Sequence, residues 1–177
     1  MTLPKLAICG YGESGKDTAS IWLAENTPLR YTVSTSAAAA EVVFNQIRHT
    51  YGYDSVEECH ADRKNHRELW GDIIREYNEP YGLTLYDELI ETNDILNGIR
   101  RRDELHAVRE AGLVDLVIWI DRVTPPDHSC DLYPGDADIV IWNFGTLEEF
   151  YGRLKRFADF GGLLEESHDG RRPRMAF

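Results

Sequence analysis

The segment at residues 10–18 restricts what this chain can fold into more than any other part of the sequence. It reads GYGESGKDT, follows the apolar run at 6–9 and precedes the helix-like run at 19–26. A strand, a glycine-rich turn, a lysine, a hydroxyl residue and a helix, in this order, are typical of a phosphate-binding loop. The glycines let backbone N–H groups point at phosphate oxygens, and the helix start adds the positive end of its dipole. We therefore predict a triphosphate-binding loop with Lys16 on the terminal phosphates.

The glycines of this loop also fit a second motif, G-x-G-x-x-G, which binds dinucleotides. That motif needs an acidic residue about 20 positions further on, at the end of the second strand. The expected second strand, 30–33, is followed by two serines and a threonine at 34–36, and the motif gives Lys16 no role. A plain glycine-rich turn also leaves this lysine unexplained, so we prefer the triphosphate interpretation. The loop departs from the usual pattern once, because Asp17 follows the lysine and the hydroxyl of Thr18 comes one position later.

Length, charge and cysteine content narrow the class of protein. A chain of 177 residues fits one domain and can bury a core of its own. The net charge of −12 argues against binding to duplex nucleic acid. The three cysteines are scattered and form no C-x-x-C pair, which argues for a reducing compartment and against a zinc site or a disulfide framework. Without a long apolar run or a signal peptide, we expect a cytoplasmic protein with no membrane contact.

Apolar runs alternate with helix-like runs along the chain. The expected strands are 5–9, 30–33, 94–99, 114–120 and 137–142. The expected helices are 16–26, 37–51, 55–77, 83–91, 100–111 and one that begins after Thr146. Residues 34–36 offer an N-cap for the second helix, and Thr146 with Glu149 forms a capping-box pattern for the last. The alternation predicts an α/β fold with a five-stranded parallel sheet in a three-layer α/β/α domain.

Several arginines can hold a second, anionic substrate, because the guanidinium group matches pairs of phosphate oxygens. Arg63 and Arg67 are four residues apart and share a helix face, and Arg75 follows on the same or the adjoining helix. A solvated, charge-laced helix face is the alternative for these three. Arg100 has a stronger claim, because it follows an expected strand at its carboxyl end, where open α/β sheets bind ligands.

Asp17 and Thr18 directly follow the lysine, and both can reach a magnesium ion. Thr18 would bind through its hydroxyl and Asp17 through its carboxylate. The alternative for Asp17 is an acidic residue in the first helical turn, where it interacts favourably with the helix dipole. Arg122 stands at the carboxyl end of the expected strand 114–120 and opens a loop that contains prolines. A mobile loop that carries an arginine onto the donor nucleotide would act as a lid.

Several segments together resemble one family. They are S-G-K-D-T at 14–18, G-I-R at 98–100, D-E at 103–104, V-R-E-A-G at 108–112, D-R at 121–122, H-S at 128–129, D-I-V-I at 138–141 and N-F-G-T-L-E-E at 143–149. In this order, over about residues 5–160, the chain resembles the P-loop deoxynucleoside monophosphate kinases of tailed bacteriophages, which lie near dephospho-coenzyme A kinases. The resemblance implies transfer of the γ-phosphate of ATP to a nucleoside or deoxynucleoside monophosphate, with Mg²⁺ as cofactor.

The resemblance also implies roles for individual residues. Those expected to hold ATP are Gly12, Glu13, Ser14, Gly15, Lys16, Asp17, Thr18, Arg122, Asn143, Gly145 and Thr146. Those expected to face the monophosphate are Arg63, Arg67, Arg75 and Arg100. The base pocket is not carried over from the family, because the central insert is short, and Ser34, Ser36 or Tyr81 are this chain's own candidates to line it. Catalysis would rest on Lys16, Arg100 and Arg122, and the metal on Asp17 and Thr18. Family members often carry an acid on the strand that here holds Asn97, which shifts weight to these two metal candidates.

The implied organisation is a single P-loop kinase domain at 1–160, with a helical substrate-binding part at about 37–92 and a lid at 121–136. A polar tail follows at 161–177. The partner expected is a small nucleotide, in the host cytoplasm if the chain comes from a phage, and a homodimer stays open. Two other functions also stay open. One is a dephospho-coenzyme A-type or other small-molecule kinase, and the other is a regulatory protein that binds ATP and transfers nothing.

Overall fold

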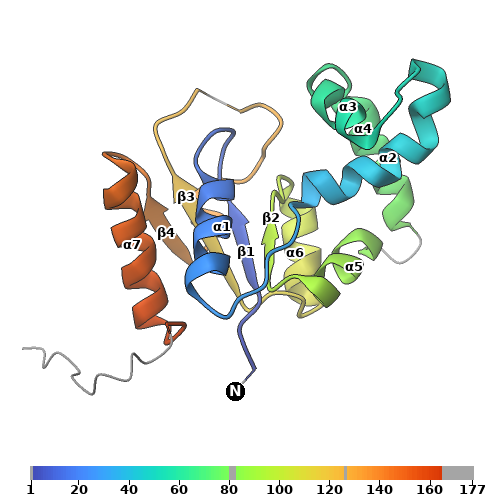
Figure 1. The fold of residues 1–177 in the computed structure, drawn as a ribbon. Coiled ribbons are helices and arrows are strands. Elements are labelled where there is room, and N and C mark those ends of the chain that lie inside the picture. The colour runs from blue at the N-terminus through green and yellow to red at the C-terminus, as the bar shows by residue number, and fades with distance from the viewer. Residues whose placement is uncertain (1, 80–82, 126, 165–177) are drawn as a thin grey trace, which may run out of the picture.

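The computed structural model describes residues 2–79, 83–125 and 127–164 (Figure 1). Its strands are β1 (Leu6–Cys9), β2 (Ile95–Asn97), β3 (Leu116–Asp121) and β4 (Ile139–Trp142). Its helices are α1 (Lys16–Asn26), α2 (Thr35–Tyr51), α3 (Val56–Asp62), α4 (Arg67–Asn78), α5 (Thr84–Thr92), α6 (Arg102–Glu110) and α7 (Leu147–Phe160), with 3₁₀ turns at Arg63–Asn65 and Pro134–Asp136. None of the helices in the described ranges is long and apolar enough to cross a membrane.

The strands form one parallel sheet in the order β2-β1-β3-β4. Leu6 of β1 pairs with Ile95 of β2 on one side and with Leu116 of β3 on the other. Strand β1 is buried along its whole length, as expected for a parallel sheet that is covered on both faces. Because the strands are parallel, their carboxyl ends lie at the same end of the sheet. The glycine-rich loop after β1, the segment after β2 and the loop after β3 all begin there.

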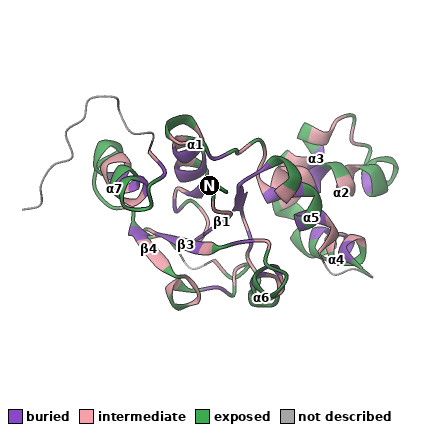
Figure 2. Ribbon diagram, turned by 90° about the horizontal axis from the view of Figure 1, so that it is seen from below, coloured by how far each residue is buried: buried purple, intermediate pink, exposed green. Residues whose placement is uncertain are grey.

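Helices cover both faces of this sheet (Figure 2). Leu6 and Ile8 of β1 pack with α1 and α7, whereas Ala7 and Cys9 pack with α5, α6 and the other helices of the opposite side. The two sets alternate because successive side chains of a strand point to opposite faces. The protein is therefore an α/β protein with a parallel sheet between helices, an arrangement compatible with three α/β/α layers.

The prediction of five strands is wrong, because the sheet has four in the described residues. Segment 30–33, the expected second strand, runs beside β2 but makes no ladder with it. Arg30 N–H donates to Oδ2 of Asp94 over 2.8 Å, and Thr32 N–H donates to Oδ1 of Asn93 over 2.7 Å. Nδ2 of Asn93 donates back to the last carbonyl of the segment over 3.2 Å. Side chains that precede β2 thus take the backbone groups that a strand pair would share.

The helix predictions are confirmed at the caps and corrected in the middle of the chain. Oγ of Ser34 accepts the N–H of Ala37 over 3.2 Å at the start of α2. The predicted capping box is present at the start of α7. The single helix expected at 55–77 is two helices, because the chain forms a 3₁₀ turn and then leaves helical geometry at His66, with φ −130° and ψ 31°. Asp62 accepts hydrogen bonds from the side chains of Tyr53 and Asn65 and lies 3.1 Å from Nε2 of His66, and these contacts stabilise the break.

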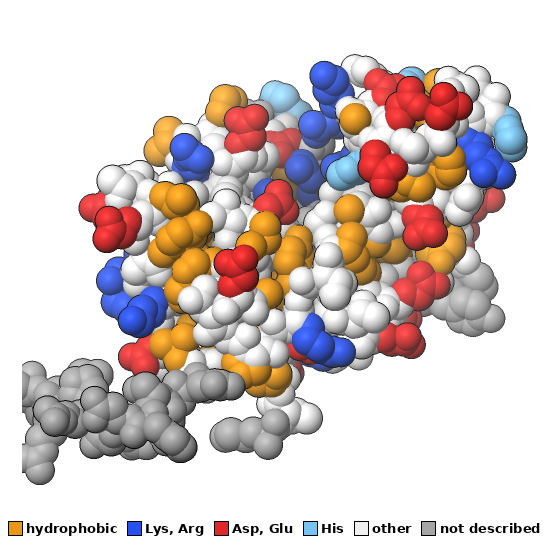
Figure 3. Space-filling model, viewed as in Figure 1, with side chains coloured by type: hydrophobic (Ala, Val, Ile, Leu, Met, Phe, Trp, Pro, Cys, Tyr) orange, Lys and Arg blue, Asp and Glu red, His pale blue; other side chains and the backbone are white. Residues whose placement is uncertain are grey.

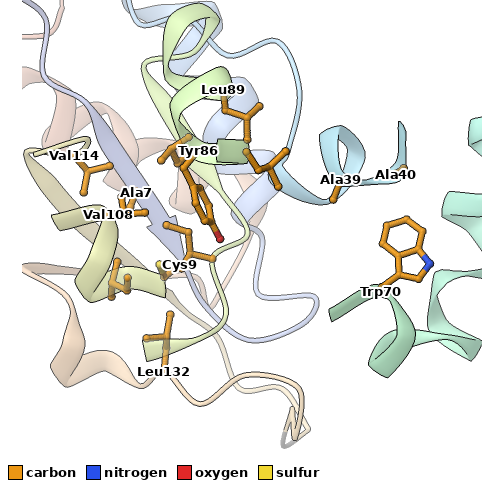
Figure 4. Packing of buried hydrophobic residues seen from close by; sticks show 14 of the residues in the cluster. Ala7, Cys9, Ala39, Ala40, Trp70, Tyr86, Leu89, Val108, Val114 and Leu132 are labelled. Atoms are coloured by element: carbon orange, nitrogen blue, oxygen red, sulfur yellow. The ribbon is translucent and has the colours of Figure 1, made fainter. Parts of the chain in front are cut away.

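Helices α2 to α5 form a helical part at one side of the sheet (Figure 1). Trp70 of α4 is buried and lies close to Ala39 and Ala40 of α2, while Tyr86 of α5 reaches toward Cys9 of β1 (Figure 4). These residues belong to one continuous hydrophobic cluster that runs from the sheet into the helical part. The helical part is therefore packed onto the sheet and positions its side chains near the carboxyl ends of the strands, where the loops begin.

Candidate functional site

The glycine-rich loop enters α1 through backbone that only certain residues adopt. Gly15 caps α1 with a φ of 99°, and Glu13 has a φ of 60°. A Cβ on Gly15 would lie 2.4 Å from Nδ2 of Asn143, so the position requires glycine for its conformation and for space. The same Nδ2 donates to the carbonyl of Ser14 over 2.7 Å and fixes the loop to the turn after β4. A non-glycine residue in the left-handed region here is the kind of strain found at ligand-binding sites.

Lys16 and Ser14 leave polar groups at the centre of this loop. Lys16 is only 8% exposed, and its Nζ donates to the carbonyl of Tyr11 over 2.6 Å, across the mouth of the loop. Burial lowers the pKa of Lys16, and the nearby charge of Arg100 lowers it further. Oγ of Ser14 is buried without a hydrogen-bond partner among the described residues. A phosphate oxygen would supply the missing partner and the counter-charge.

A carboxylate from the loop after β3 sits on the glycine-rich loop. Oδ2 of Asp127 accepts the N–H of Gly12 over 2.9 Å and a hydrogen bond from Nη1 of Arg100 over 2.8 Å. Oδ1 accepts both the N–H and the hydroxyl of Ser129, over 3.1 and 2.6 Å. Burial raises the pKa of Asp127, but the hydrogen bonds from Ser129 and the charge of Arg100 outweigh this and hold it well below its ordinary value.

Two of the predicted substrate arginines meet at Ser129, and a third lies near them. Arg100 and Arg67 each donate Nη1 to Oγ of Ser129, over 2.7 and 2.8 Å. Burial lowers the pKa of Arg63, and the charges of Arg100 and Arg67 lower it further, so all three lie within electrostatic reach of one another. The Arg63 guanidinium lies 5.6 Å from the ring centre of Trp70. Figure 3 shows Lys and Arg side chains gathered between the sheet and the helical part, at the top of the view.

Other predicted substrate residues do not join these contacts. Arg75 lies on the exposed side of α4, where it forms an ion pair of 2.7 Å with Asp72 of the same helix. The hydroxyl of Ser34 caps α2 and lies 3.2 Å from that of Ser36. The prediction that Tyr81 lines a base pocket falls outside the described residues.

The metal candidates lie at the start of α1, next to β2. Oδ1 of Asp17 accepts a hydrogen bond from Nδ2 of Asn97 over 2.7 Å, and the same Nδ2 lies 3.1 Å from the Tyr31 hydroxyl. Asn97 is the strand residue where the resembled family often has an acid, and it is 2% exposed. The carboxylate of Asp17, on the adjacent helix, therefore contacts this strand position. No group of three or more His, Cys, Asp or Glu side chains in the described ranges could hold a metal by itself.

The predicted adenine-side turn lines a cavity of about 360 Å³ beside the loop. Its walls come from the loop, the start of α1, the first residues after β3, and the turn that leads into α7. The residues are Gly15, Thr18, Arg122, Val123, Asn143, Phe144, Gly145, Leu147 and Phe150. Nη1 of Arg122 reaches the carbonyl of Glu13 over 3.4 Å, and Arg153 stacks on Phe144 with its guanidinium 5.0 Å from the ring centre. The cavity therefore combines apolar side chains with a few polar groups, as small-molecule sites commonly do.

A larger cavity of about 550 Å³ lies in the helical part, between α2, the end of α4, and α5. Apolar side chains such as Val42, Leu85 and Leu89 line it together with Glu41 and Glu88. Its lining shares no residue with the arginine cluster or with the glycine-rich loop, so it belongs to neither of them.

The residues that sequence reasoning missed are Asp127, Ser129 and the partner role of Asn97. An Asp followed two positions later by Ser is a common turn pattern, and the structure contains this local turn. Nothing in that pattern indicates which distant backbone group the carboxylate meets. The contact with Gly12 joins residues 115 positions apart and depends on the path of the whole loop.

The comparisons with known proteins add no assignment. No protein-family model matches the chain. A search of curated proteins also found no significant match.

Proposed function

We propose that the protein is a (deoxy)nucleoside monophosphate kinase of the P-loop type, which transfers the γ-phosphate of ATP to a nucleoside or deoxynucleoside monophosphate. The observation that carries the proposal is the meeting of two kinds of cationic site at one point. The lysine-bearing loop contributes backbone N–H groups and Lys16, and two arginines from other elements, Arg67 and Arg100, converge on the neighbouring Ser129, with the charge of Arg63 nearby. A triphosphate donor and an anionic acceptor placed on these two sites would face each other.

On the donor side, the loop would hold the phosphates of ATP and the neighbouring cavity its base. The buried Ser14 hydroxyl, the N–H of Gly12 and Nζ of Lys16 are the groups that would meet phosphate oxygens. The cavity of about 360 Å³ offers Phe144 as an apolar wall and Asn143 as a polar group near an adenine ring. Arg122 lines this cavity and also donates to the carbonyl of Glu13 in the glycine-rich loop. It stands at the start of the loop that would act as lid.

The residues present suit a magnesium ion whose ligands would come partly from the protein and partly from the nucleotide. Asp17 and the hydroxyl of Thr18 are the groups that would hold it, and Asn97 orients the carboxylate from behind. Mg²⁺, when bound, would supply positive charge against the charge that develops on the phosphate oxygens. A site with few protein ligands suits this ion, because Mg²⁺ usually keeps several waters and binds substrate phosphates.

On the acceptor side, the arginines would hold the monophosphate and direct one of its oxygens at the donor. Phosphoryl transfer depends mostly on such positioning and on charge stabilisation. A phosphate acceptor is already ionised near neutral pH, so the chain needs no general base. Arg63 and Arg67, from the turn and helix after α3, and Arg100, which follows β2, would converge on the acceptor phosphate.

A regulatory ATP-binding protein is the second candidate, and Asn97 in place of a strand carboxylate is the observation that favours it. The contact of 2.7 Å between Asn97 and Asp17 weighs against it, because a carboxylate is present one element away.

A coupled assay of ADP release tests the proposal. ATP, Mg²⁺ and each common ribo- and deoxyribonucleoside monophosphate are supplied in turn, with dephospho-coenzyme A as a further acceptor. We expect at least one monophosphate to give a diphosphate. Transfer only to dephospho-coenzyme A would move the protein to that class of kinase, and tight ATP binding without acceptor-dependent ADP release would identify the regulatory alternative.

A further inference from the structure

We propose that Asp127 is an internal competitor for the phosphate site, a carboxylate of the chain itself that occupies the glycine-rich loop until a polyphosphate displaces it. The inference rests on the proposed function, in that it takes the loop to be a phosphate site. It goes beyond that function because it assigns to one lid residue the control of access to the loop.

The geometry of Asp127 is that of a bound anion. One of its oxygens takes the N–H of Gly12, a backbone donor of the phosphate loop, together with Nη1 of Arg100, at 2.9 and 2.8 Å. The other oxygen takes two hydrogen bonds from Ser129, so both oxygens are fully engaged. The Asp127 side chain is 14% exposed. A Cβ on Gly12 would lie 3.2 Å from its Oδ2, which shows how closely the carboxylate approaches the loop.

The charges around Asp127 explain why a carboxylate is held there. Lys16 and Arg63 are both within electrostatic reach of it, and Arg100 pairs with it directly. Without an anion at this point, buried or half-buried cations would face one another, which is costly in a poorly solvated site. Asp127 offsets part of that repulsion, and a phosphate group with more negative charge would offset more of it.

Displacement of Asp127 would also release the acceptor arginines. Ser129 links the carboxylate to Arg67 and Arg100 through one hydroxyl, and Cys130 N–H donates to the carbonyl of Asp127 over 3.1 Å. A polyphosphate on the loop therefore has to move the segment 127–130 as a unit. Entry of the donor and release of the arginines for the acceptor become one event.

An affinity measurement with inorganic tripolyphosphate tests the competitor. An occupied site lowers apparent affinity by the fraction of molecules in which the site is free. Asp127→Asn removes the charge, and we expect it to bind tripolyphosphate about tenfold more tightly than the wild type, within the usual range for coupled sites. Asp131→Asn is the matched control, because it removes the same charge from an exposed position in the same loop, where Asp131 accepts the N–H of Arg102 over 2.7 Å. We expect its affinity to equal that of the wild type.

Alkylation of Cys130 tests the displacement of Asp127 in the wild-type protein. This test therefore does not depend on whether Asp127→Asn folds. Cys9 and Cys59 are buried, whereas Cys130 is half-buried and lies in the segment that must move. We expect tripolyphosphate to speed alkylation of Cys130 severalfold, as read by mass spectrometry. The negative charge of the ligand alone would raise the pKa of the thiol and slow the reaction, so acceleration reports exposure.

The outcomes separate this inference from the proposed function. Equal or weaker binding of tripolyphosphate by Asp127→Asn, or alkylation of wild-type Cys130 that is unchanged or slower, overturns the competitor and leaves the phosphate loop in place. If neither the wild type nor any variant binds tripolyphosphate, the assignment of the loop as a phosphate site fails, and the competitor fails with it.

Discussion

The proposed donor side and the proposed acceptor side of the candidate site are built in different ways. The proposed donor side is one continuous segment, in which backbone groups and a strained turn would form the binding surface. The proposed acceptor side consists of three long side chains, Arg63, Arg67 and Arg100, whose backbones belong to separate elements. A backbone surface is rigid and fails as a whole when it is disturbed. A surface made of side chains can lose one member and keep part of its function.

Lys16→Ala gives the largest expected effect and tests the donor half of this comparison. We expect kcat/KM for any accepted monophosphate to fall about 10²- to 10³-fold, the usual loss when one preorganised electrostatic group is removed. The fold should survive, because the side-chain hydrogen bond that the variant loses among the described residues is the one from Nζ to the carbonyl of Tyr11. Steady-state kinetics and far-UV circular dichroism measure the two quantities. Full activity would mean that the loop is not the donor site.

Arg100→Ala comes next and tests the acceptor half. We expect KM for the monophosphate to rise about 10- to 100-fold, because a hydrogen bond to a charged group contributes about 1.5–3 kcal/mol. KM for ATP should change much less. Arg75→Ala is the matched control, because Arg75 is exposed and pairs only with Asp72 in the described residues. Unchanged acceptor kinetics in Arg100→Ala would move the role to Arg63 or Arg67.

Gly15→Ala sharpens the claim that the donor surface is backbone. The new Cβ would meet Nδ2 of Asn143 at a φ of 99°, and we expect a loss of roughly 2–3 kcal/mol in the free energy of unfolding. Gly52→Ala is the control, since Gly52 has a φ of 74° but open space around it, and strain alone should cost about 1–2 kcal/mol. Urea unfolding measures both. Equal losses in the two variants would show that the closeness of Asn143 does not add to the cost of a side chain at position 15.

Arg67→Ala gives the smallest effect and tests whether the acceptor side loses function in steps. Arg67 is exposed and shares Ser129 with Arg100, so we expect KM for the monophosphate to rise only about two- to fivefold. The double variant Arg67→Ala/Arg100→Ala should show a coupling energy that differs from zero, because the two residues share a contact. A loss as large as that of Arg100→Ala would contradict the stepwise picture.

The sequence predicted best those features that short segments determine. The glycine-rich turn, the cap at Ser34 and the capping box at Thr146 each depend on residues within a few positions of one another, and the structure confirms these turns and caps. The parallel sheet was also predictable, because strands alternate with helices along the chain.

Features that depend on contacts between distant segments were not predictable. Segment 30–33 has the composition of a strand, yet the side chains of Asn93 and Asp94 take its backbone groups. The break before α4 depends on Asp62, which accepts hydrogen bonds from Tyr53 and Asn65. The placement of Asp127 on Gly12 needs the path of the whole lid loop. In each case a polar side chain could hydrogen-bond to several different groups, and the sequence alone does not indicate which of these groups lies within reach in the fold.

The irregular segment beside β2 has a consequence for how molecules of this protein behave toward one another. A parallel sheet with a bare outer strand offers its free N–H and C=O groups to a strand of another molecule, which is a route to aggregation. Segment 30–33 lies beside the residues that lead into β2, and the side chains of Asn93 and Asp94 occupy its backbone groups, so this segment offers little for strand addition. At the other edge, β4 ends in the half-exposed Trp142, and the described chain supplies no further strand. Any ordered growth of the sheet between molecules would therefore begin at β4.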